Sequence, residues 1–237
     1  MGRKKRGSAA RTVFRLVLLI GVGVAGFAGW RWLQDHPEHN PYAPLKLDDP
    51  VGWATSQKLV ALRDDITECR AVLERSSVSY TALPETGEGA CARPDRTQLA
   101  DFPLAPATPA VTCPVATGLE MWKRKSVEPA AREILGSDLA RIEHMGAFNC
   151  RKISGSSSWS QHATANAIDI SAFVLEDGRR ITLIGDWDEG ADKTRFLQRI
   201  RDDACGIFAT VLSPDFNAAH ADHFHFDQDA RWVSVCR

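Results

Sequence analysis

Four histidines and one aspartate stand at positions from which they could bind a metal ion. Three of the seven histidines fall within six residues, in the run HADHFHFD: His220, His223 and His225. His162 precedes Asp169 by seven positions in the run SQHATANAIDIS. Imidazole nitrogens and carboxylates are zinc ligands, and three protein ligands with a fourth position open to water are typical of a catalytic zinc site. Two histidines and one carboxylate also suit iron or manganese, so residue types alone leave the metal open.

Short strands would bring these groups together. If residues 224–226 form a strand, His223 and His225 point to the same face, because side chains alternate along a strand. Asp169 stands between two isoleucines that must point to the opposite face. A carboxylate in such a strand is costly to desolvate unless a cation or a histidine pairs with it. We therefore expect a loop-borne His162, a strand-borne Asp169 and His225 from a distant strand to form one ligand set.

The elements that must position these residues are short strands with helices at one end. A helix is expected over 192–204, and two more over 113–125 and from Pro129 to Gly136. The β-like runs are 140–148, 165–173, 180–184, 209–212, 224–226 and 232–235. This order of elements predicts an α+β fold built on a largely antiparallel sheet with flanking helices.

The first half of the chain has a different sequence pattern. Residues 33–49 carry three prolines without an apolar period and are expected to form a linker. Asp49 and Pro50 are typical of a helix start. Apolar residues then recur at three- and four-residue spacing, which predicts one amphipathic helix: Leu59, Leu62, Ile66, Cys69 and Leu73. The prolines of 78–109 exclude a long regular element there. We thus expect residues 50–110 to form a helix with a wrapping segment, and residues 111–237 to form the domain that carries the site.

The N-terminus predicts a membrane anchor. The chain of 237 residues has a net charge of −1, but its first fifteen residues carry six cations and no acid. The remainder is therefore acidic, which argues against nucleic acid as a partner. Residues 16–30 carry no charge, and cations before such a segment predict a cytoplasmic N-terminus. A cleaved signal peptide is the alternative, with small residues at Gly26 and Ala28. Trp30 and Trp32 favour an uncleaved, single-pass anchor in the inner membrane, with the rest of the chain in the periplasm.

All six cysteines follow this apolar segment, and none belongs to a C-x-x-C pair. They are Cys69, Cys91, Cys113, Cys150, Cys205 and Cys236. An even number in an exported domain predicts disulfides in an oxidising space. Their pairing cannot be deduced from the sequence, although Cys69 with Cys91 would be the natural local closure.

The histidine motifs resemble those of known peptidases. The segments 160–162, 167–169 and 222–225 are similar to the S-x-H-x6-D and D-H-x-H motifs of zinc D-Ala-D-Ala carboxypeptidases and lysostaphin-type metallopeptidases. The longer strings CPVATGLEMW, NAIDISAF and HADHFHFD resemble the bacterial extensin-like C-terminal domain family. This resemblance covers about residues 113–236.

The resemblance implies a role for each residue of the motifs. His162, Asp169 and His225 would hold zinc, Asp222 would act as the general base, and His223 would steady the developing oxyanion or orient the attacking water. In a fully extended strand Asp222 would face away from its neighbours, so the chain must turn or bulge there. Without such a turn Asp222 would orient a neighbour instead of acting as the base.

Further residues are expected beside the ligands. Ser160 and His220 are expected around the metal or the substrate. The peptidases also carry an arginine or other donor that binds the carbonyl oxygen, and Arg151 is the best candidate, with Arg141 as the alternative. Ala165 stands where those peptidases often have glycine.

Together these features predict a membrane-anchored periplasmic zinc peptidase, a carboxypeptidase or endopeptidase, that acts on peptidoglycan stem peptides. The alternative is an inactive, metal-stabilised module that binds the cell wall or an envelope assembly. Deleting residues 50–109 is expected to distinguish a structural role in an envelope assembly from catalysis, because catalysis should largely survive the deletion and assembly should not.

Overall fold

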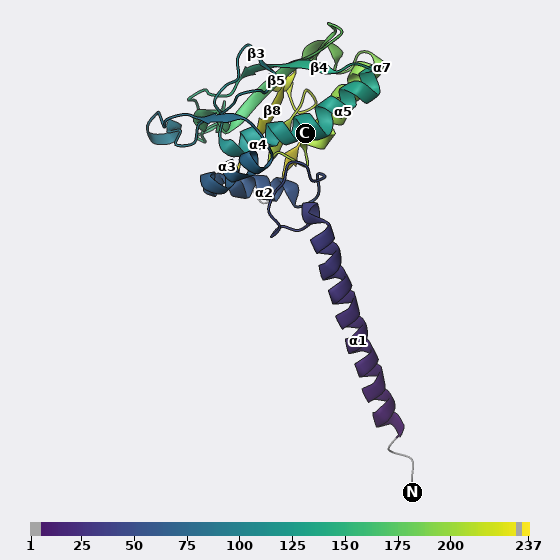
Figure 1. Ribbon diagram of the computed structural model, residues 1–237. Helices are drawn as coiled ribbons and strands as arrows, with labels where there is room; N and C mark the ends of the chain where they lie inside the picture. Colours follow the sequence, from purple (N-terminus) through teal and green to yellow (C-terminus); the bar gives the residue numbers. More distant parts are fainter. Residues whose placement is uncertain (1–5, 231–233) are drawn as a thin grey trace.

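The N-terminal helix stands apart from the folded part of the chain. The computed structural model describes residues 6–230 and 234–237. Helix α1 (Arg6–Asp35) projects away from the other elements (Figure 1). Residues Ala9–Asp35 are the one helical stretch of the described chain that is long and apolar enough to cross a membrane. Its 27 residues span about 40 Å at 1.5 Å per residue, which exceeds the hydrocarbon thickness of a bilayer, about 30 Å.

The folded part is built on one mixed sheet. Within the described residues the strand order is β3-β4-β5-β8-β7-β9, and β6 also pairs with β5. The strands are β3 (Leu104–Ala105), β4 (Leu139–Gly146), β5 (Ala167–Leu175), β6 (Arg180–Thr182), β7 (Thr210–Leu212), β8 (Phe224–Asp227) and β9 (Val235–Cys236).

The fold is α+β, but its sheet is not strictly antiparallel. The central pairs are antiparallel, whereas β3 pairs with β4 and β9 pairs with β7 in parallel. Both parallel pairs are only two residues long and lie at the edges, where segments from distant parts of the chain attach to the sheet. The last strand was expected over 232–235; residues 232 and 233 lie outside the described residues, and the strand found there begins at Val235.

One long helical run packs against this sheet. It comprises α4 (Cys113–Trp122), a wider π-helical turn (Lys123–Val127), α5 (Glu128–Ala130) and a second π-helical turn (Ala131–Leu135). Two separate helices were expected, because a proline usually ends a helix. Here the turns on both sides of α5 are π-helical, which changes the hydrogen-bond ladder around Pro129, so the helix continues. It ends at Gly136, whose φ of 67° favours glycine.

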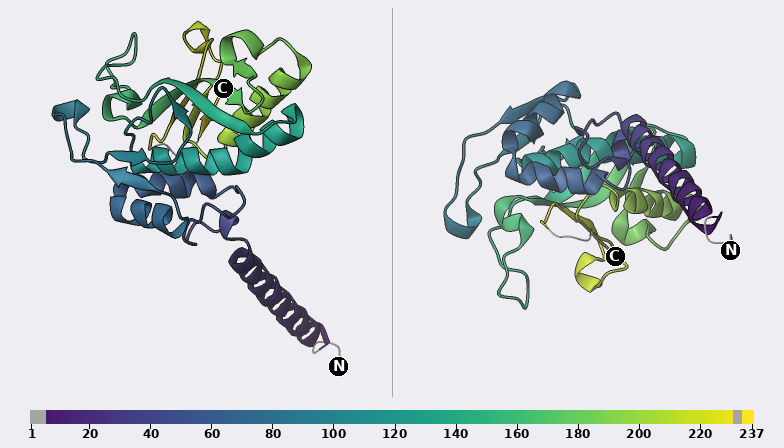
Figure 2. Two further views of the ribbon diagram at one scale, coloured as in Figure 1. Left: turned by 45° about the horizontal axis from the view of Figure 1, so that its top comes forward. Right: turned by 90° about the horizontal axis from the view of Figure 1, so that it is seen from below.

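Aromatic side chains fill the space between helices and sheet. The Trp122 ring meets Phe173 of β5 and Phe226 of β8 edge-on, with centroids 5.8 and 5.0 Å apart. Its indole nitrogen donates to the Ile200 carbonyl oxygen of α7 (Ala191–Ala204) at 2.8 Å. The helices α4 and α7 thus share one core with the central strands (Figure 2).

The expected amphipathic helix is two helices. These are α2 (Thr55–Ala61) and α3 (Ile66–Arg75), separated by a 3-10 turn (Leu62–Asp64). The break falls at Asp65, whose carboxylate caps α3 by accepting from the Glu68 amide at 2.8 Å. Apolar periodicity continues across this break, which is why the sequence pattern did not reveal it.

The segment before α2 does not begin a helix at Asp49, and it is not a free linker. Gly52 packs so closely on the backbone of Glu38 that any side chain at residue 52 would collide with it. The Ala54 amide donates to the Glu38 carbonyl oxygen at 3.2 Å. Leu47 is completely buried. Residues 36–54 are therefore attached to the folded domain.

The Pro-rich segment contains structure of its own. Strands β1 (Tyr80–Ala82) and β2 (Thr97–Leu99) form an antiparallel pair, and a 3-10 turn (Gly89–Cys91) lies between them. Strand β3 follows in the same segment. The sequence analysis did not identify these three strands, because each has only two or three residues.

Three disulfides connect the described residues, and the expected Cys69–Cys91 pair is not among them. The bonds are Cys69–Cys113, Cys91–Cys150 and Cys205–Cys236. Packing of α3 on α4 brings Cys69 to Cys113, although 44 residues separate them in sequence. The first two disulfides tie residues 50–109 to the rest of the domain. We therefore no longer expect catalysis to survive the deletion of residues 50–109.

Candidate metal centre

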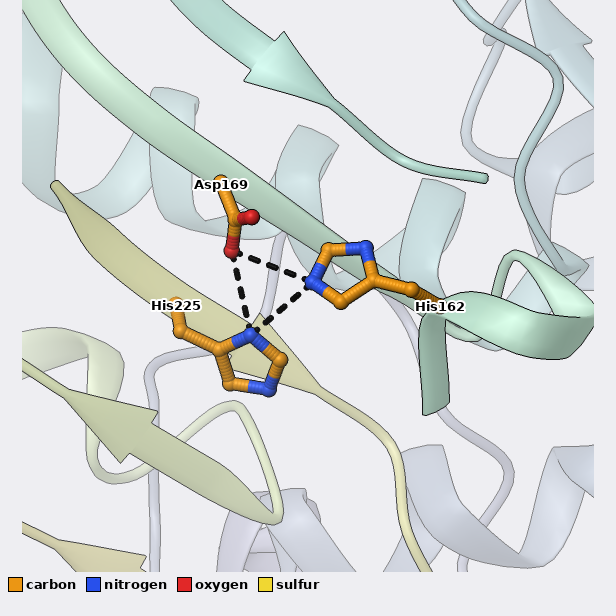
Figure 3. Close-up of side chains that lie close together, drawn as sticks. All are labelled: His162, Asp169 and His225. Carbon is orange, nitrogen blue, oxygen red and sulfur yellow. Dashed lines mark hydrogen bonds and ion pairs between the residues drawn. The ribbon is translucent and has the colours of Figure 1, made fainter. Parts of the chain in front are cut away.

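Three side chains from separate elements converge on one point (Figure 3). His162 lies in the 3-10 turn Gln161–Thr164, Asp169 in β5 and His225 in β8. Their ligand atoms all lie within 4.8 Å of one another. His162 Nε2 is 3.2 Å from Asp169 Oδ1 and 3.1 Å from His225 Nδ1, and His225 Nδ1 is 3.1 Å from Asp169 Oδ1.

Strand geometry accounts for this convergence. Asp169 and His225 are direct partners across the antiparallel pair of β5 and β8. Their apolar neighbours point to the other face and are fully buried: Ile168, Ile170, Phe224 and Phe226. The alternation expected for both strands is therefore what brings the carboxylate and the imidazole together.

Each candidate ligand histidine makes a hydrogen bond through the ring nitrogen that points away from the cluster, which we call its outer nitrogen. His162 Nδ1 donates to the Ala147 carbonyl oxygen at 3.0 Å, because a carbonyl can only accept. His225 Nε2 donates to the Asp227 carboxylate at 3.0 Å. The inner nitrogens, His162 Nε2 and His225 Nδ1, therefore face each other and the Asp169 carboxylate. Electron-rich atoms this close repel one another unless a cation, either a proton or a metal ion, lies among them.

The charges of the metal-free cluster follow from these contacts. Burial raises the pKa of Asp169, but hydrogen bonds from His162 and His225 outweigh it and hold that pKa well below its ordinary value. Burial lowers the pKa of His225, but its bonds to Asp169 and Asp227 outweigh burial and raise the pKa to about 9. At neutral pH a proton on His225 thus stands where a metal ion would bind.

The donor set fits a divalent transition metal. Two imidazole nitrogens and one carboxylate oxygen are available, and the outer nitrogen of each imidazole is already hydrogen-bonded, as is usual for metal-binding histidines. Three protein ligands leave room in the coordination sphere for a further molecule. The same set suits zinc, iron and manganese, so the geometry does not choose among them.

A carboxylate–imidazole pair lies next to the ligands. His223 Nε2 is 3.6 Å from Asp169 Oδ1, and His223 Nδ1 is 2.8 Å from Asp222 Oδ1. Asp222 lies in a turn before β8, so the chain does turn where the sequence analysis required it. Within the described residues the hydrogen bond of the Asp222 carboxylate goes to His223, which it orients toward the cluster.

Ser160 positions His162, the first of the candidate ligands. Its hydroxyl accepts from the His162 amide at 3.3 Å and caps the 3-10 turn that carries this histidine. The turn ends at Ala165, which has a φ of 56°. This left-handed conformation favours glycine, so Ala165 adopts a backbone conformation that is uncommon for a residue with a side chain.

His220 lies at the edge of the cluster. Its ring centroid is 5.2 Å from that of His223 and 6.1 Å from that of His225. Its Nδ1 bonds Asn217 Oδ1 at 2.8 Å. Burial, followed by the positive charges of the two neighbouring imidazoles, lowers the pKa of His220 to about 4. His220 is thus a neutral neighbour of the site at neutral pH.

The guanidinium groups of the two candidate arginines do not contact the cluster, although the Arg151 carbonyl oxygen accepts from the Ser160 amide at 3.1 Å. Arg141 pairs with Glu143 at 3.3 Å. It stands opposite Val174 in the sheet, five residues along β5 from Asp169, which is roughly 17 Å at 3.4 Å per residue. Arg151 is exposed, and its guanidinium lies 3.4 Å from the Lys152 carbonyl oxygen. Among the bonds of the described residues neither guanidinium reaches the cluster.

The sequence analysis missed the buried carboxylate of Asp227. Asp227 follows His225 by two positions and therefore lies on the same strand face. The same alternation that was used for His223 and His225 would have identified it.

A polar network behind the turn Gln161–Thr164 was not predicted either. Arg63 donates to Gln161 Oε1 at 3.5 Å and to the Gln228 carbonyl oxygen at 3.4 Å. The fully buried Asn166 donates to the same Gln161 oxygen at 2.8 Å and accepts from the Thr112 hydroxyl at 2.7 Å. These contacts connect residues far apart in sequence, and no local pattern indicates them.

A comparison with protein families places most of the chain in one family. The model named "Extensin-like protein C-terminus" matches residues 67–237. The chain belongs to this family. The matched part contains all three candidate ligands and all six cysteines, whereas Arg63 and the segment attached to α1 precede it. No curated protein and no solved structure matches the chain.

Proposed function

We propose that the extensin-like domain is a zinc-dependent peptidase that hydrolyses amide bonds in peptidoglycan stem peptides. One observation carries the proposal: the inner nitrogens of His162 and His225 and the Asp169 carboxylate converge within 4.8 Å, with the outer nitrogens of both imidazoles already bonded. Such a preformed, partly buried donor set is costly to maintain without a cation.

The residues around the cluster have complementary tasks in this proposal. A zinc ion held there supplies the Lewis acidity that polarises a carbonyl group and makes a water molecule more acidic. The resemblance to zinc peptidases implies that Asp222 acts as the general base, which accepts a proton from this water. Because Asp222 bonds His223 Nδ1 at 2.8 Å, the two groups can share this role. His223 Nε2 faces the cluster and takes or returns a proton there, while the carboxylate balances the charge of the imidazolium.

The substrate and its location are inferred from three features. The peptidase motifs suggest an amide bond in a wall peptide. The apolar helix α1, with cations before it, suggests an anchor with the domain beyond the inner membrane. Three disulfides suit an oxidising space such as the periplasm.

Digestion of purified sacculi tests this function. Wild-type chain with zinc should release stem-peptide fragments that mass spectrometry detects. Asp222→Ala and His223→Ala should keep the metal and lose most of the release, whereas His162→Ala should lose both. If Asp222→Ala released as many stem-peptide fragments as the wild type, Asp222 would be excluded as the general base.

A metal-stabilised wall-binding module is the second candidate. The observation that favours it is the position of the two arginines, since neither Arg141 nor Arg151 contacts the described cluster. It predicts that the zinc-loaded chain binds sacculi without releasing any fragment, and that chelation lowers its thermal stability.

A further inference from the structure

Aromatic rings connect the end of α1 to the folded domain. The Trp32 ring of α1 stacks on His39 with centroids 5.4 Å apart and planes within 8°. His39 in turn contacts Trp53, at 5.6 Å between centroids. Trp32 and Trp53, 21 positions apart in sequence, are therefore no more than 11 Å apart in space. We call Trp32, His39 and Trp53 the basal patch.

The basal patch exposes apolar surface that the protein itself does not cover. Trp32 is 47% exposed and Trp53 is 66% exposed. Tyr42, in the same segment, is 94% exposed. Large exposed aromatic groups are uncommon on a surface that meets only water, and they indicate a site of interaction.

The segment that carries the patch is held in place. His36 Nδ1 bonds the buried Glu38 carboxylate at 3.0 Å. Lys58 of α2 donates to the Pro37 carbonyl oxygen at 2.5 Å, and the Trp53 amide contacts His39 Nδ1 at 3.4 Å. The position of Trp53 relative to the end of α1 is therefore set by these contacts of the fold, and not by a flexible linker. Figure 1 shows α1 leading directly into the folded part of the chain.

We propose that the basal patch lies in the headgroup layer of the bilayer that α1 spans, so that the domain docks on the membrane in one orientation. This inference rests on the membrane anchor in the proposed function. The patch is continuous with α1, and Trp32 follows the apolar stretch directly, at the depth where tryptophan and tyrosine accumulate. Headgroup and interfacial regions add about 5–8 Å on each side of the hydrocarbon, and the docked orientation requires Trp53 to lie within this depth.

Tryptophan quenching in vesicles tests the docking. The full-length chain would be reconstituted in phosphatidylethanolamine and phosphatidylglycerol, with lipids brominated near the headgroup as quenchers. The quenched fluorescence should fall in Trp53→Phe, because the wild-type residue is one of those quenched. The control Trp159→Phe removes an exposed indole beside the turn Gln161–Thr164 and should leave the amount of quenched fluorescence unchanged.

A third variant distinguishes docking of the basal patch from insertion of α1 in the membrane. Trp30→Phe reports whether α1 is inserted, since Trp30 belongs to that helix. A quenching loss for Trp30→Phe without one for Trp53→Phe would overturn the docking and leave the anchor standing. Loss for neither would refute the anchor, and the docking with it. If chemical cross-linking through Trp53 instead joins two copies or another protein while bromolipid quenching is absent, the patch is a protein interface and the proposal is wrong.

Discussion

Replacing Asp227 by asparagine should weaken zinc binding without removing a ligand. The Asp227 carboxylate accepts from His225 Nε2 at 3.0 Å and is almost completely buried. This bond directs the other nitrogen, Nδ1, toward the cluster and makes it a better donor to a metal. Asparagine keeps the shape of the side chain but lacks the charge, so the bond becomes a neutral one.

The size of this effect can be estimated. Loss of such a partner typically costs 10–100-fold in metal affinity, which is about 1.4–2.7 kcal/mol. At saturating zinc for the wild type, the variant should lose a similar amount of metal-linked stability. For a domain of this length, 1 kcal/mol shifts the melting temperature by about 2–4 °C. We therefore expect a melting temperature about 3–11 °C lower in zinc.

Competition titration with a fluorescent zinc chelator measures the affinity, and calorimetry measures the stability. Asp203→Asn is a matched control, because this aspartate bonds Ser126 and Arg199 on the helices and no ligand histidine. If Asp227→Asn folds like the wild type and binds zinc within twofold of the wild-type affinity, the Asp227 carboxylate does not orient His225 Nδ1 for metal binding or make it a better donor.

Two further predictions concern protons and the polar network. The pKa of His225 is raised from 6.5 to about 9 in the metal-free fold, so protonation contributes stability that is complete below about pH 6.5 and lost as the pH rises to about 9. Zinc must displace this proton, so the zinc affinity should rise with pH up to about 9; a flat titration profile would contradict the charge assignment. Arg63→Ala should lower the unfolding free energy in denaturant titrations by about 1 kcal/mol and also weaken zinc binding, because the guanidinium supports Gln161 beside the first ligand. The control Arg75→Ala removes a half-exposed ion pair with Glu68 and should change stability by less than about 0.5 kcal/mol; equal effects of the two variants would count against a positioning role for Arg63.

The parts of this molecule that could be predicted from sequence are those set by local geometry. Alternation along residues 223–226 placed His223 and His225 on one face, and the isoleucines beside Asp169 oriented its carboxylate. These predictions needed only the two-residue period of a strand. The turn at Asp222 was expected on a different ground, because the base role that the resemblance implies for this residue required it.

The other features escaped prediction for two reasons. The apolar period hid the local cap that Asp65 provides for α3, and the π-helical turns let the helix continue through Pro129. Other features depend on contacts between distant segments. Cysteine pairing followed helix packing, which joins Cys69 to Cys113 instead of to its nearer neighbour Cys91. No pattern within a short window contains this information.

A zinc titration of the chelator-stripped, full-length chain tests the central claim most directly. We predict that the wild type binds one zinc ion and that His162→Ala, at the same protein and metal concentrations, binds none while retaining its fold. Failure of the wild type to bind zinc, or equal binding by His162→Ala, would contradict the assignment of the cluster as a metal centre.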